Sequence, residues 1–385
     1  MRNSHIALVL GGIAIVLGLF IAVRVVFPAA QTAATGTISQ PIRIGAALGL
    51  SGECANYGEG ELKAVELAIS EANASGGIEG RQLKLVSEDT LCSPEGSVNA
   101  MKKLIEADHV EGIIGLTWGD SFQAGFTVNN AAHIPAIAPS AALEALFYNK
   151  ASVTYTYSTW FPEVDEIDAL ENQAQKMGRM RFVIVHDTDT YGAMLALQFV
   201  KQAPEHNLQI MGEYSVPVGT QDFRTIIIQI KNKHPDGVAL FFQAPSAKTS
   251  FLKQARDLGL SVQAFTDASI EDASLLKNYS GVMEGLIYTR PRTTGDVSSF
   301  SQKFKVMHGV DAVGASDANA YDAARVLIAA LTDHYKNGTD LNAAIAHVDI
   351  PGTAVARIRF DDSHQITGAE FQIKTVENGQ FVVLQ

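Results

Sequence analysis

The chain lacks the short motifs that mark common ligand chemistries. Its first strand–helix loop, residues 51–58, carries neither a dinucleotide fingerprint nor a phosphate-loop lysine. Its ten histidines show no HExxH or HxxxH spacing, and no GxSxG elbow is present. Asp187 and Asp189 resemble a calcium loop, but the glycine and glutamate that complete such a loop are missing. We therefore expect no metal, no cofactor and no catalytic residues, which means that the protein is not an enzyme.

Basic residues are also scarce. The 385 residues contain 29 Lys and Arg against 41 Asp and Glu, a formal net charge of −12, and no basic cluster reverses that balance. Such a surface repels nucleic acid and anionic lipid, so nucleic acid is not an expected partner. The length and the 47% content of hydrophobic residues fit two domains of ordinary size, each with its own core.

Only two cysteines occur, Cys54 and Cys92. Each follows a predicted strand, and the two strands should be neighbours in one parallel sheet, so their loops should lie side by side. In an oxidising compartment this arrangement favours a disulfide. The alternative is two unrelated thiols, and the spacing matches no metal site.

A single long apolar run spans Ile6 to Val23, 18 residues without a charge, and follows Arg2. It has the length of a membrane span, whereas a signal-peptide core is usually shorter. Small residues at Ala30 and Ala34 fit a cleavage site, but Arg24 departs from the signal-peptide pattern. We expect export to the periplasmic or extracellular face of the membrane. Residues 1–40 are read as a signal peptide or an uncleaved membrane anchor with a short linker, and both remain open.

From residue 41 onward, strand patterns alternate with helix patterns in two series. Residues 41–89, for example, give a strand, a polar loop, a helix over 60–74, a glycine stop and a second strand. The alternation predicts an α/β fold with two doubly wound parallel-sheet lobes joined by several crossovers. The expected boundaries are 41–157 plus 290–350 for lobe 1 and 158–289 plus 351–385 for lobe 2, with closing antiparallel strands at 357–360, 369–375 and 381–384.

Open parallel sheets bind ligands beyond the carboxyl ends of their strands. Tyr57, Trp118, Asp120, Ser140 and Tyr191 all lie in segments that follow predicted strands. A tryptophan there would supply the flat apolar wall that small-molecule sites often have. We therefore take these five residues as candidates for binding a small solute.

Several landmarks, taken together, are specific in order and spacing. They are Ile42–Gly45, Leu50–Gly52 with Tyr57-Gly58, Asn73–Gly80, Gly115, Ser121–Gln123, Pro139–Ala141, Ile184–Asp187 with Tyr191-Gly192, and Gln254–Arg256 with Gly259. By these landmarks the chain resembles the type I periplasmic solute-binding proteins, in the leucine/isoleucine/valine-binding branch, over residues 41–385. The resemblance implies two lobes that close on a solute, delivery to the permease subunits of an ABC importer, and no catalysis.

On the first-lobe side, the resemblance carries the family's amino-acid pocket over only in part. Gly119 stands where the family has a serine that binds the ligand carboxylate. The turn Ser140-Ala141-Ala142 ends in alanine where the family usually has a ligand-binding threonine. The chain has therefore lost two hydroxyl groups that the family uses.

On the second-lobe side, Tyr191 matches the family's tyrosine that covers the ligand. The acid that pairs with a ligand ammonium falls at Asp267 or Ala268, and a shift of one residue decides whether that charge is present. Each hydrogen bond to a charged ligand group contributes roughly 1.5–3 kcal/mol, so such losses matter.

Two classes of ligand remain open. A branched-chain or related amino acid requires that Asp120, Ser121 and Asp267 replace the lost groups. An amide, a urea-like solute or a small carboxylate needs fewer of them. A competing function is a membrane-anchored sensory ectodomain that signals through a partner protein.

Overall fold

The computed structural model describes residues 40–52, 54–144, 153–312 and 314–384. The apolar run near the N-terminus, with the expected signal peptide or anchor, lies outside these residues. In the part of the chain that is described, no helix combines the length and the apolar character needed to cross a membrane.

The first sheet has five parallel strands in the order β2-β1-β3-β4-β5. We call this sheet with its helices the first lobe. Its strands are β1 (Ile42–Leu48), β2 (Leu83–Asp89), β3 (Gly112–Gly115), β4 (Ala136–Ala138) and β5 (Thr156–Ser158). Its helices are α1 (Ala55–Ala74), α2 (Pro94–Lys102), the π-helix η1 (Lys103–Ala107), α3 (Gly119–Ala132), α10 (Val297–His308), α11 (Ala315–Asn337) and α12 (Leu341–Ala346).

The second sheet has seven strands in the order β14-β13-β10-β9-β8-β6-β7, and all pairs are parallel except that β13 runs antiparallel to both β10 and β14. With its helices it forms the second lobe. Its strands are β6 (Arg181–Asp187), β7 (Gln209–Val216), β8 (Gly237–Phe241), β9 (Gln263–Thr266), β10 (Ile287–Arg292), β13 (Glu370–Glu377) and β14 (Gln380–Val383). Its helices are α5 (Glu163–Lys176), α6 (Thr190–Gln202), α7 (Arg224–Lys231), α8 (Pro245–Asp257), the 3-10 turn η2 (Ala268–Ile270) and α9 (Ala273–Met283).

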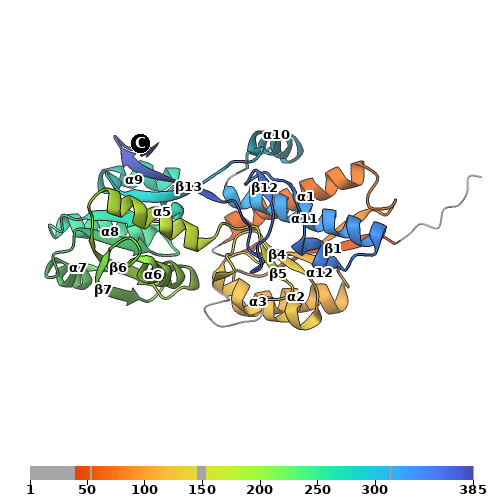
Figure 1. Ribbon diagram of the computed structural model, residues 1–385, viewed down its shortest axis with the longest axis horizontal. Coiled ribbons are helices and arrows are strands. Elements are labelled where there is room, and N and C mark those ends of the chain that lie inside the picture. Colours follow the sequence, from red (N-terminus) through yellow and green to blue (C-terminus); the bar gives the residue numbers. More distant parts are fainter. Residues whose placement is uncertain (1–39, 53, 145–152, 313, 385) are drawn as a thin grey trace, which may run out of the picture. The chain divides into compact units, whose positions relative to one another are not determined.

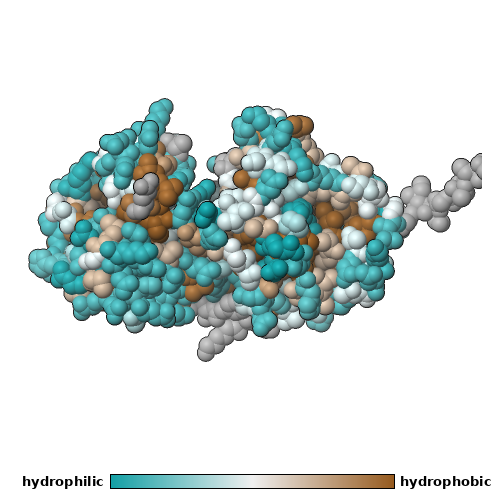
Figure 2. Space-filling view, turned by 45° about the horizontal axis from the view of Figure 1, so that its top comes forward, coloured by the Kyte–Doolittle hydropathy of each residue, from teal (hydrophilic) through white to brown (hydrophobic). Residues whose placement is uncertain are grey.

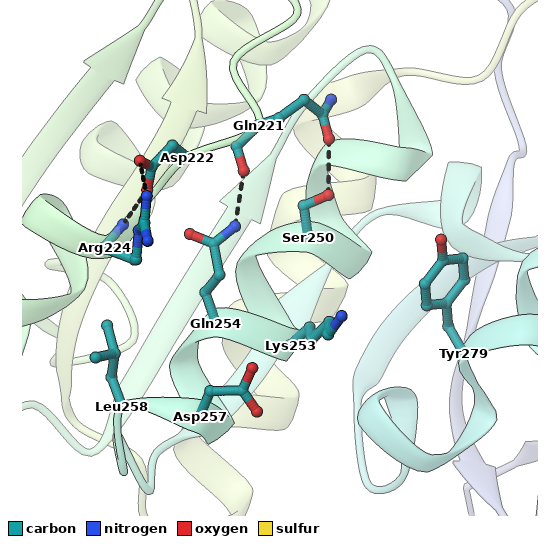
Figure 3. Close-up of a pocket in the computed structure, with 9 residues that line it drawn as sticks. All are labelled: Gln221, Asp222, Arg224, Ser250, Lys253, Gln254, Asp257, Leu258 and Tyr279. Atoms are coloured by element: carbon teal, nitrogen blue, oxygen red, sulfur yellow. Dashed lines mark hydrogen bonds and ion pairs between the residues drawn. The ribbon is translucent and has the colours of Figure 1, made fainter.

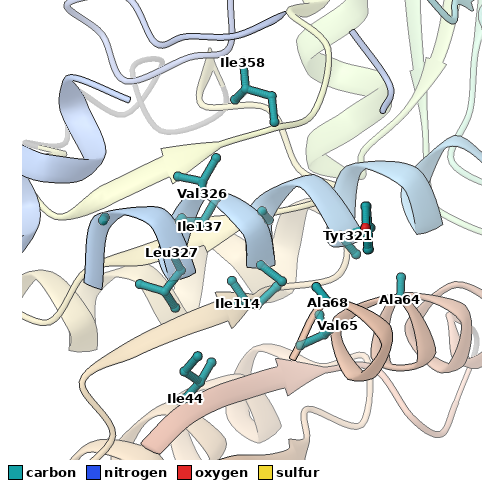
Figure 4. Close-up of a cluster of buried hydrophobic side chains, with 14 of the residues drawn as sticks. Ile44, Ala64, Val65, Ala68, Ile114, Ile137, Tyr321, Val326, Leu327 and Ile358 are labelled. Atoms are coloured by element: carbon teal, nitrogen blue, oxygen red, sulfur yellow. The ribbon is translucent and has the colours of Figure 1, made fainter. Parts of the chain in front are cut away.

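Both sheets are covered by helices on their two faces (Figure 1). Alternate residues of β1 and β3 supply opposite cores: Ile44 packs with α1 and α11, whereas Ile113 packs with α2 and α3. Figure 4 shows the first of these cores, in which Ile44 and Ile114 lie close to Val65 of α1 and Leu327 of α11. The second lobe repeats the pattern with two further cores. The expected doubly wound α/β fold is thereby confirmed.

Hydrophilic side chains cover most of the face shown in Figure 2, in keeping with the large excess of acidic residues. Burial of the apolar faces of both sheets is therefore the main stabilising contribution.

The closing strands differ from expectation at one place. β12 (Arg357–Ile358) pairs only with β11 (Ile350–Pro351) in a separate two-stranded sheet, so the strand expected at 357–360 does not join the second sheet. Ile358 and Ile366 instead belong to the same buried core as Ile44 of β1 and the apolar face of α11. The residue boundaries of the lobes stay a prediction, and by its packing this stretch lies with the first lobe.

Helix α1 begins at Ala55, five residues before the expected start. Gly58 and Gly60 made the start of this helix resemble a loop, but each glycine lies so close to another part of the chain that no β-carbon would fit. A β-carbon at Gly58 would lie 2.1 Å from the carbonyl oxygen of Gly49, and one at Gly60 would lie 2.2 Å from Asp317 Oδ1. Tyr57 therefore projects from the first turn of a helix, which fixes its position more firmly than a loop would.

Candidate functional site

A cavity of about 550 Å³ lies where the carboxyl ends of strands from both lobes meet. Residues that follow β4, β6, β8 and β9 line it, which is the position that open parallel sheets provide for ligands. The cavity brings together seven of the nine candidate ligand-binding residues: Tyr57, Trp118, Gly119, Ser140, Ala141, Ala142 and Tyr191.

Two aromatic side chains form a wall on the first-lobe side. The rings of Tyr57 and Trp118 meet edge to face, with centroids 5.9 Å apart. Trp118 caps α3 with a φ of 67°, a backbone conformation that residues with a β-carbon rarely adopt. Such conformations are costly and persist only where the surrounding structure holds them, and they are found mainly at functional sites. The strained backbone presents the indole to the cavity.

Gly119, at the position where the resemblance implies a serine, lies close to the second lobe. A β-carbon at Gly119 would lie 3.2 Å from Cβ of Thr190, in the first turn of α6. The Thr190 hydroxyl donates a hydrogen bond to Asp120. Asp120 therefore bridges the two lobes and does not line the cavity. A serine at position 119 would crowd Thr190, so the glycine here serves a close approach.

Asp267 also does not line the cavity, whereas Ala268 does. Asp267 and Lys248 are both fully buried, and Lys248 Nζ lies 2.5 Å from Asp267 Oδ2. Burial disfavours the charged carboxylate, but the ammonium and hydrogen bonds from Lys248 and Ser269 outweigh it and lower the pKa of Asp267. Of the two positions left open by the sequence, the one facing the cavity carries no charge.

Acidic residues that the sequence reasoning missed line the cavity instead, among them Glu163 and Glu166. Glu163 and Glu166 lie on the first turns of α5, one turn apart, with side chains that are 3% and 5% exposed. Glu166 Oε1 accepts hydrogen bonds from Thr289 Oγ1 (2.6 Å) and from the Ala268 amide (3.3 Å). Their signal was present in the sequence, because both acids share the buried face of α5 with Ile167.

Burial and neighbouring carboxylates change the acid–base character of this side. Burial, followed by repulsion from Asp267, raises the pKa of Glu166 to about 7. Burial also raises the pKa of Glu163 well above its ordinary value, with further contributions from Glu144 and Glu166. Burial and the carboxylates of Asp267 and Glu166 raise the pKa of Tyr191. A positive charge bound beside these two carboxyl groups would therefore favour their ionised forms.

The sequence reasoning also missed several neutral and charged residues that line the cavity, including Asn56, Trp160, Phe161, Thr190, Gln243 and Arg290. Arg290 is already paired, because its Nε atom lies 3.7 Å from Glu271 Oε2. Within the described ranges, no group of three or more His, Cys, Asp or Glu residues is arranged to hold a metal ion.

The disulfide lies next to the first-lobe wall. Cys54 is bonded to Cys92, with Cα atoms 5.9 Å apart. It joins the start of α1 to the loop after β2, and Asp89 in that strand accepts hydrogen bonds from the amides of Leu50 and Leu91. The bond therefore anchors the turn that carries Tyr57.

A second hollow, of about 560 Å³, lies on the second lobe beside α7, α8 and α9 (Figure 3). Its polar groups are occupied with one another: Ser250 and Gln254 bond to Gln221, and Arg224 bonds to Asp222. Its residues serve below as controls for the cavity.

The comparisons with known proteins agree with this geometry. A model of the periplasmic binding protein family matches residues 41–380. The Leu/Ile/Val-binding protein of Escherichia coli K12 is 25% identical over 341 residues, which cover 87% of this chain and 91% of that protein.

Two solved structures share the fold at 19% identity. A leucine-binding protein of Thermotoga maritima aligns with a TM-score of 0.76, over 89% of this chain and 98% of that one. A solute-binding protein of an ABC transporter from R. palustris, in complex with benzoate, aligns with a TM-score of 0.73, over 89% and 95%.

The chain belongs to the periplasmic binding protein family and has the type I fold of that family. The resemblance inferred from the sequence is thereby confirmed, and the role is that of a solute-binding protein.

Proposed function

We propose that this protein binds a small organic solute in the cavity between its lobes and delivers it to the permease subunits of an ABC importer. The observation that carries the proposal is the cavity at the strand ends, lined from both sheets by aromatic side chains and a few polar groups. Closure around the solute would be a hinge motion, favoured by the ligand's higher affinity for the closed form.

Within this proposal, Tyr57, Trp118 and Tyr191 form the apolar walls, and the turn at Ser140 gives the polar edge. Gly119, Ala141 and Ala142 leave room beside them. The solute is an amino-acid-like or amide molecule. The Escherichia coli relative, a Leu/Ile/Val-binding protein, supports the amino-acid-like class.

The proposal includes export and the absence of catalysis. The apolar segment at residues 6–23 would direct export, and the Cys54–Cys92 disulfide is typical of an oxidising compartment. Membership of a family of binding proteins supports a role without chemistry.

A thermal-shift screen of the purified protein tests this function. The library contains amino acids, amines, amides, urea and small carboxylates. A ligand present at 100 times its dissociation constant stabilises the folded state by about 2.7 kcal/mol, which gives a clear rise in unfolding temperature. No rise with any compound would contradict the proposal.

Matched variants locate the response. Trp118→Ala and Tyr191→Ala should reduce the shift given by a hit, because they remove walls of the cavity. Tyr279→Ala, at the second hollow, should leave it unchanged. Equal losses in all three variants would place the ligand elsewhere.

A further inference from the structure

The acid next to the cavity in the second lobe is already neutralised from within the chain. Asp267 accepts from Lys248 Nζ, and its Oδ1 accepts from the Ser269 amide at 2.9 Å. Lys248 also donates to the Ser269 hydroxyl. A buried pair held this way has no spare charge for a ligand. If the solute carries a positive group, other carboxylates must bind it.

Helix α5 supplies two such carboxylates. Glu163 and Glu166 are an i, i+3 pair, so their side chains lie on one face of the helix, and both line the cavity. Thr289 and the Ala268 amide fix Glu166 from one side. Glu163 Oε2 is buried and has no hydrogen-bond partner among the residues that the structure describes. Because an unsatisfied buried carboxyl oxygen is costly, it indicates a missing partner from outside the chain.

The surroundings select the sign of that partner. Of the described residues that line the cavity, five are acidic and only Arg290 is basic, and Arg290 lies beside Glu271. The charged and titratable groups that face Glu163 and Glu166 are Glu144, Asp189, Tyr191, Asp267 and Lys248. Since Lys248 is paired with Asp267, no unpaired positive group remains in that set. An anionic ligand group would meet repulsion here.

The opposite wall also favours a cation. Tyr57 and Trp118 present aromatic rings from the first lobe, and Trp160 and Phe161, just before helix α5 in the sequence, also line the cavity. A desolvated cation close to a ring face gains additional electrostatic stabilisation. Carboxylates on one side and rings on the other are the chemistry that binds organic ammonium and guanidinium groups.

We propose that Glu163 and Glu166 form the binding site for a positively charged nitrogen group of the solute. The inference rests on the proposed solute-binding function and narrows it to small organic cations, which include amines and amino acids. Neutral amides and simple carboxylates are excluded as ligands. Of the two candidate positions for the second-lobe acid, Asp267 is paired with Lys248 and Ala268 carries no charge.

The test uses pairs of probes that share a skeleton: butylamine with butyrate, benzylamine with benzoate, and L-leucine with 4-methylpentanoate. The purified protein is screened by thermal shift, and dissociation constants of the hits are measured by titration calorimetry. The proposal expects hits among the amines or leucine and none among the carboxylates. Hits among the carboxylates alone would overturn it and leave the solute-binding function intact, whereas no hits at all would contradict that function.

Isosteric variants then assign the contact. E163Q and E166Q should each weaken binding of the cationic hit by at least about tenfold, because each removes a charge-assisted hydrogen bond. E171Q is the matched control: Glu171 is buried on the same helix but does not line the cavity. Unchanged affinity in E163Q and E166Q would overturn the proposal.

Proton release provides a second readout that a merely structural role would not change. Calorimetry in two buffers of different ionisation enthalpy should show that the wild type releases protons when the cation binds. E166Q should release fewer. Equal release in both proteins, with E166Q folded by circular dichroism, would overturn the assignment of Glu166.

Discussion

The two sides of the cavity are built from different chemistry. The first-lobe side, with Tyr57, Trp118 and the Ser140–Ala142 turn, is aromatic and small, and the disulfide holds its leading turn in place. The second-lobe side, with Glu163 and Glu166, carries buried carboxyl groups, of which Glu166 accepts a hydrogen bond from Thr289. The first-lobe side therefore supplies apolar walls and the second-lobe side supplies charged groups. Substitutions on the two sides should change stability and ligand affinity in different ways.

The largest expected effect concerns the buried pair on the second-lobe side. Lys248→Ala should lower the free energy of unfolding by about 3–5 kcal/mol, because it leaves Asp267 buried and unpaired. Urea unfolding measures the change. The control is Arg224→Ala, which removes an exposed partner of Asp222 and should have no measurable effect. Equal effects of the two variants would show that the buried pair does not stabilise this side.

On the first-lobe side, reducing the disulfide should be nearly as costly. The bond closes a loop of 38-residue separation, which corresponds to about 4 kcal/mol in the chain-entropy model. Cys54→Ser combined with Cys92→Ser should show this loss in thermal unfolding. If the double variant were as stable as the wild type, the disulfide would not be what holds the turn of Tyr57.

A third prediction concerns the pH dependence of stability that buried Glu61 causes. Burial raises the pKa of Glu61, on the first-lobe side, from 4.5 to about 7, and Thr117 donates to it. A carboxyl with a raised folded-state pKa stabilises the fold below its unfolded pKa, and that contribution is lost as the pH rises through the folded-state value. Between pH 4.5 and 8, wild type should therefore lose about 3 kcal/mol relative to E61Q. A constant difference between the two proteins over that range would contradict the raised pKa.

A fourth prediction concerns ligand affinity. Because the pKa of Glu166 is about 7 without ligand, a bound cation must displace a proton at lower pH. Affinity for a cationic hit should rise by up to about tenfold per unit between pH 6 and 7 and level off above that. E166Q should flatten the profile. A wild-type profile that is already flat would argue that the cation does not contact Glu166.

The smallest effect is expected at the meeting point of the two sides. Gly119→Ala should push Thr190 away by a few tenths of an ångström, since a β-carbon there lies 3.2 Å from Thr190 Cβ. Affinity for the ligand should fall a few-fold. The double variant with Thr190→Ala should recover part of it, whereas no recovery would show that this close approach does not limit closure.

Much of the fold could be predicted because it depends on local patterns. Alternating strands and helices with long apolar faces define both sheets, and Cys54 and Cys92 follow neighbouring strands. Helix α9 (Ala273–Met283) was missed, because Asn278, Ser280 and Gly281 are poor helix formers. Its Asp272 cap and the burial of Met283 override that local preference.

The site could be predicted only where a strand end places a residue directly. Ser140 and Tyr191 follow strands and line the cavity. The partnership of Lys248 with Asp267 depends on how β9 and α8 pack, which no local pattern encodes. Glu163 was overlooked because an acid at a helix start usually faces solvent and favours the helix dipole, whereas here it points into the protein.

The central claim, that helix α5 binds the charged group of the solute, is tested most directly by a crystal structure with a cationic hit bound. The account predicts its nitrogen at about 2.7–2.9 Å from the carboxyl oxygens of Glu163 and Glu166, with its carbon skeleton against Tyr57 and Trp118. A nitrogen bound near Ser140 instead, with an apolar or anionic end of the ligand against α5, would contradict it.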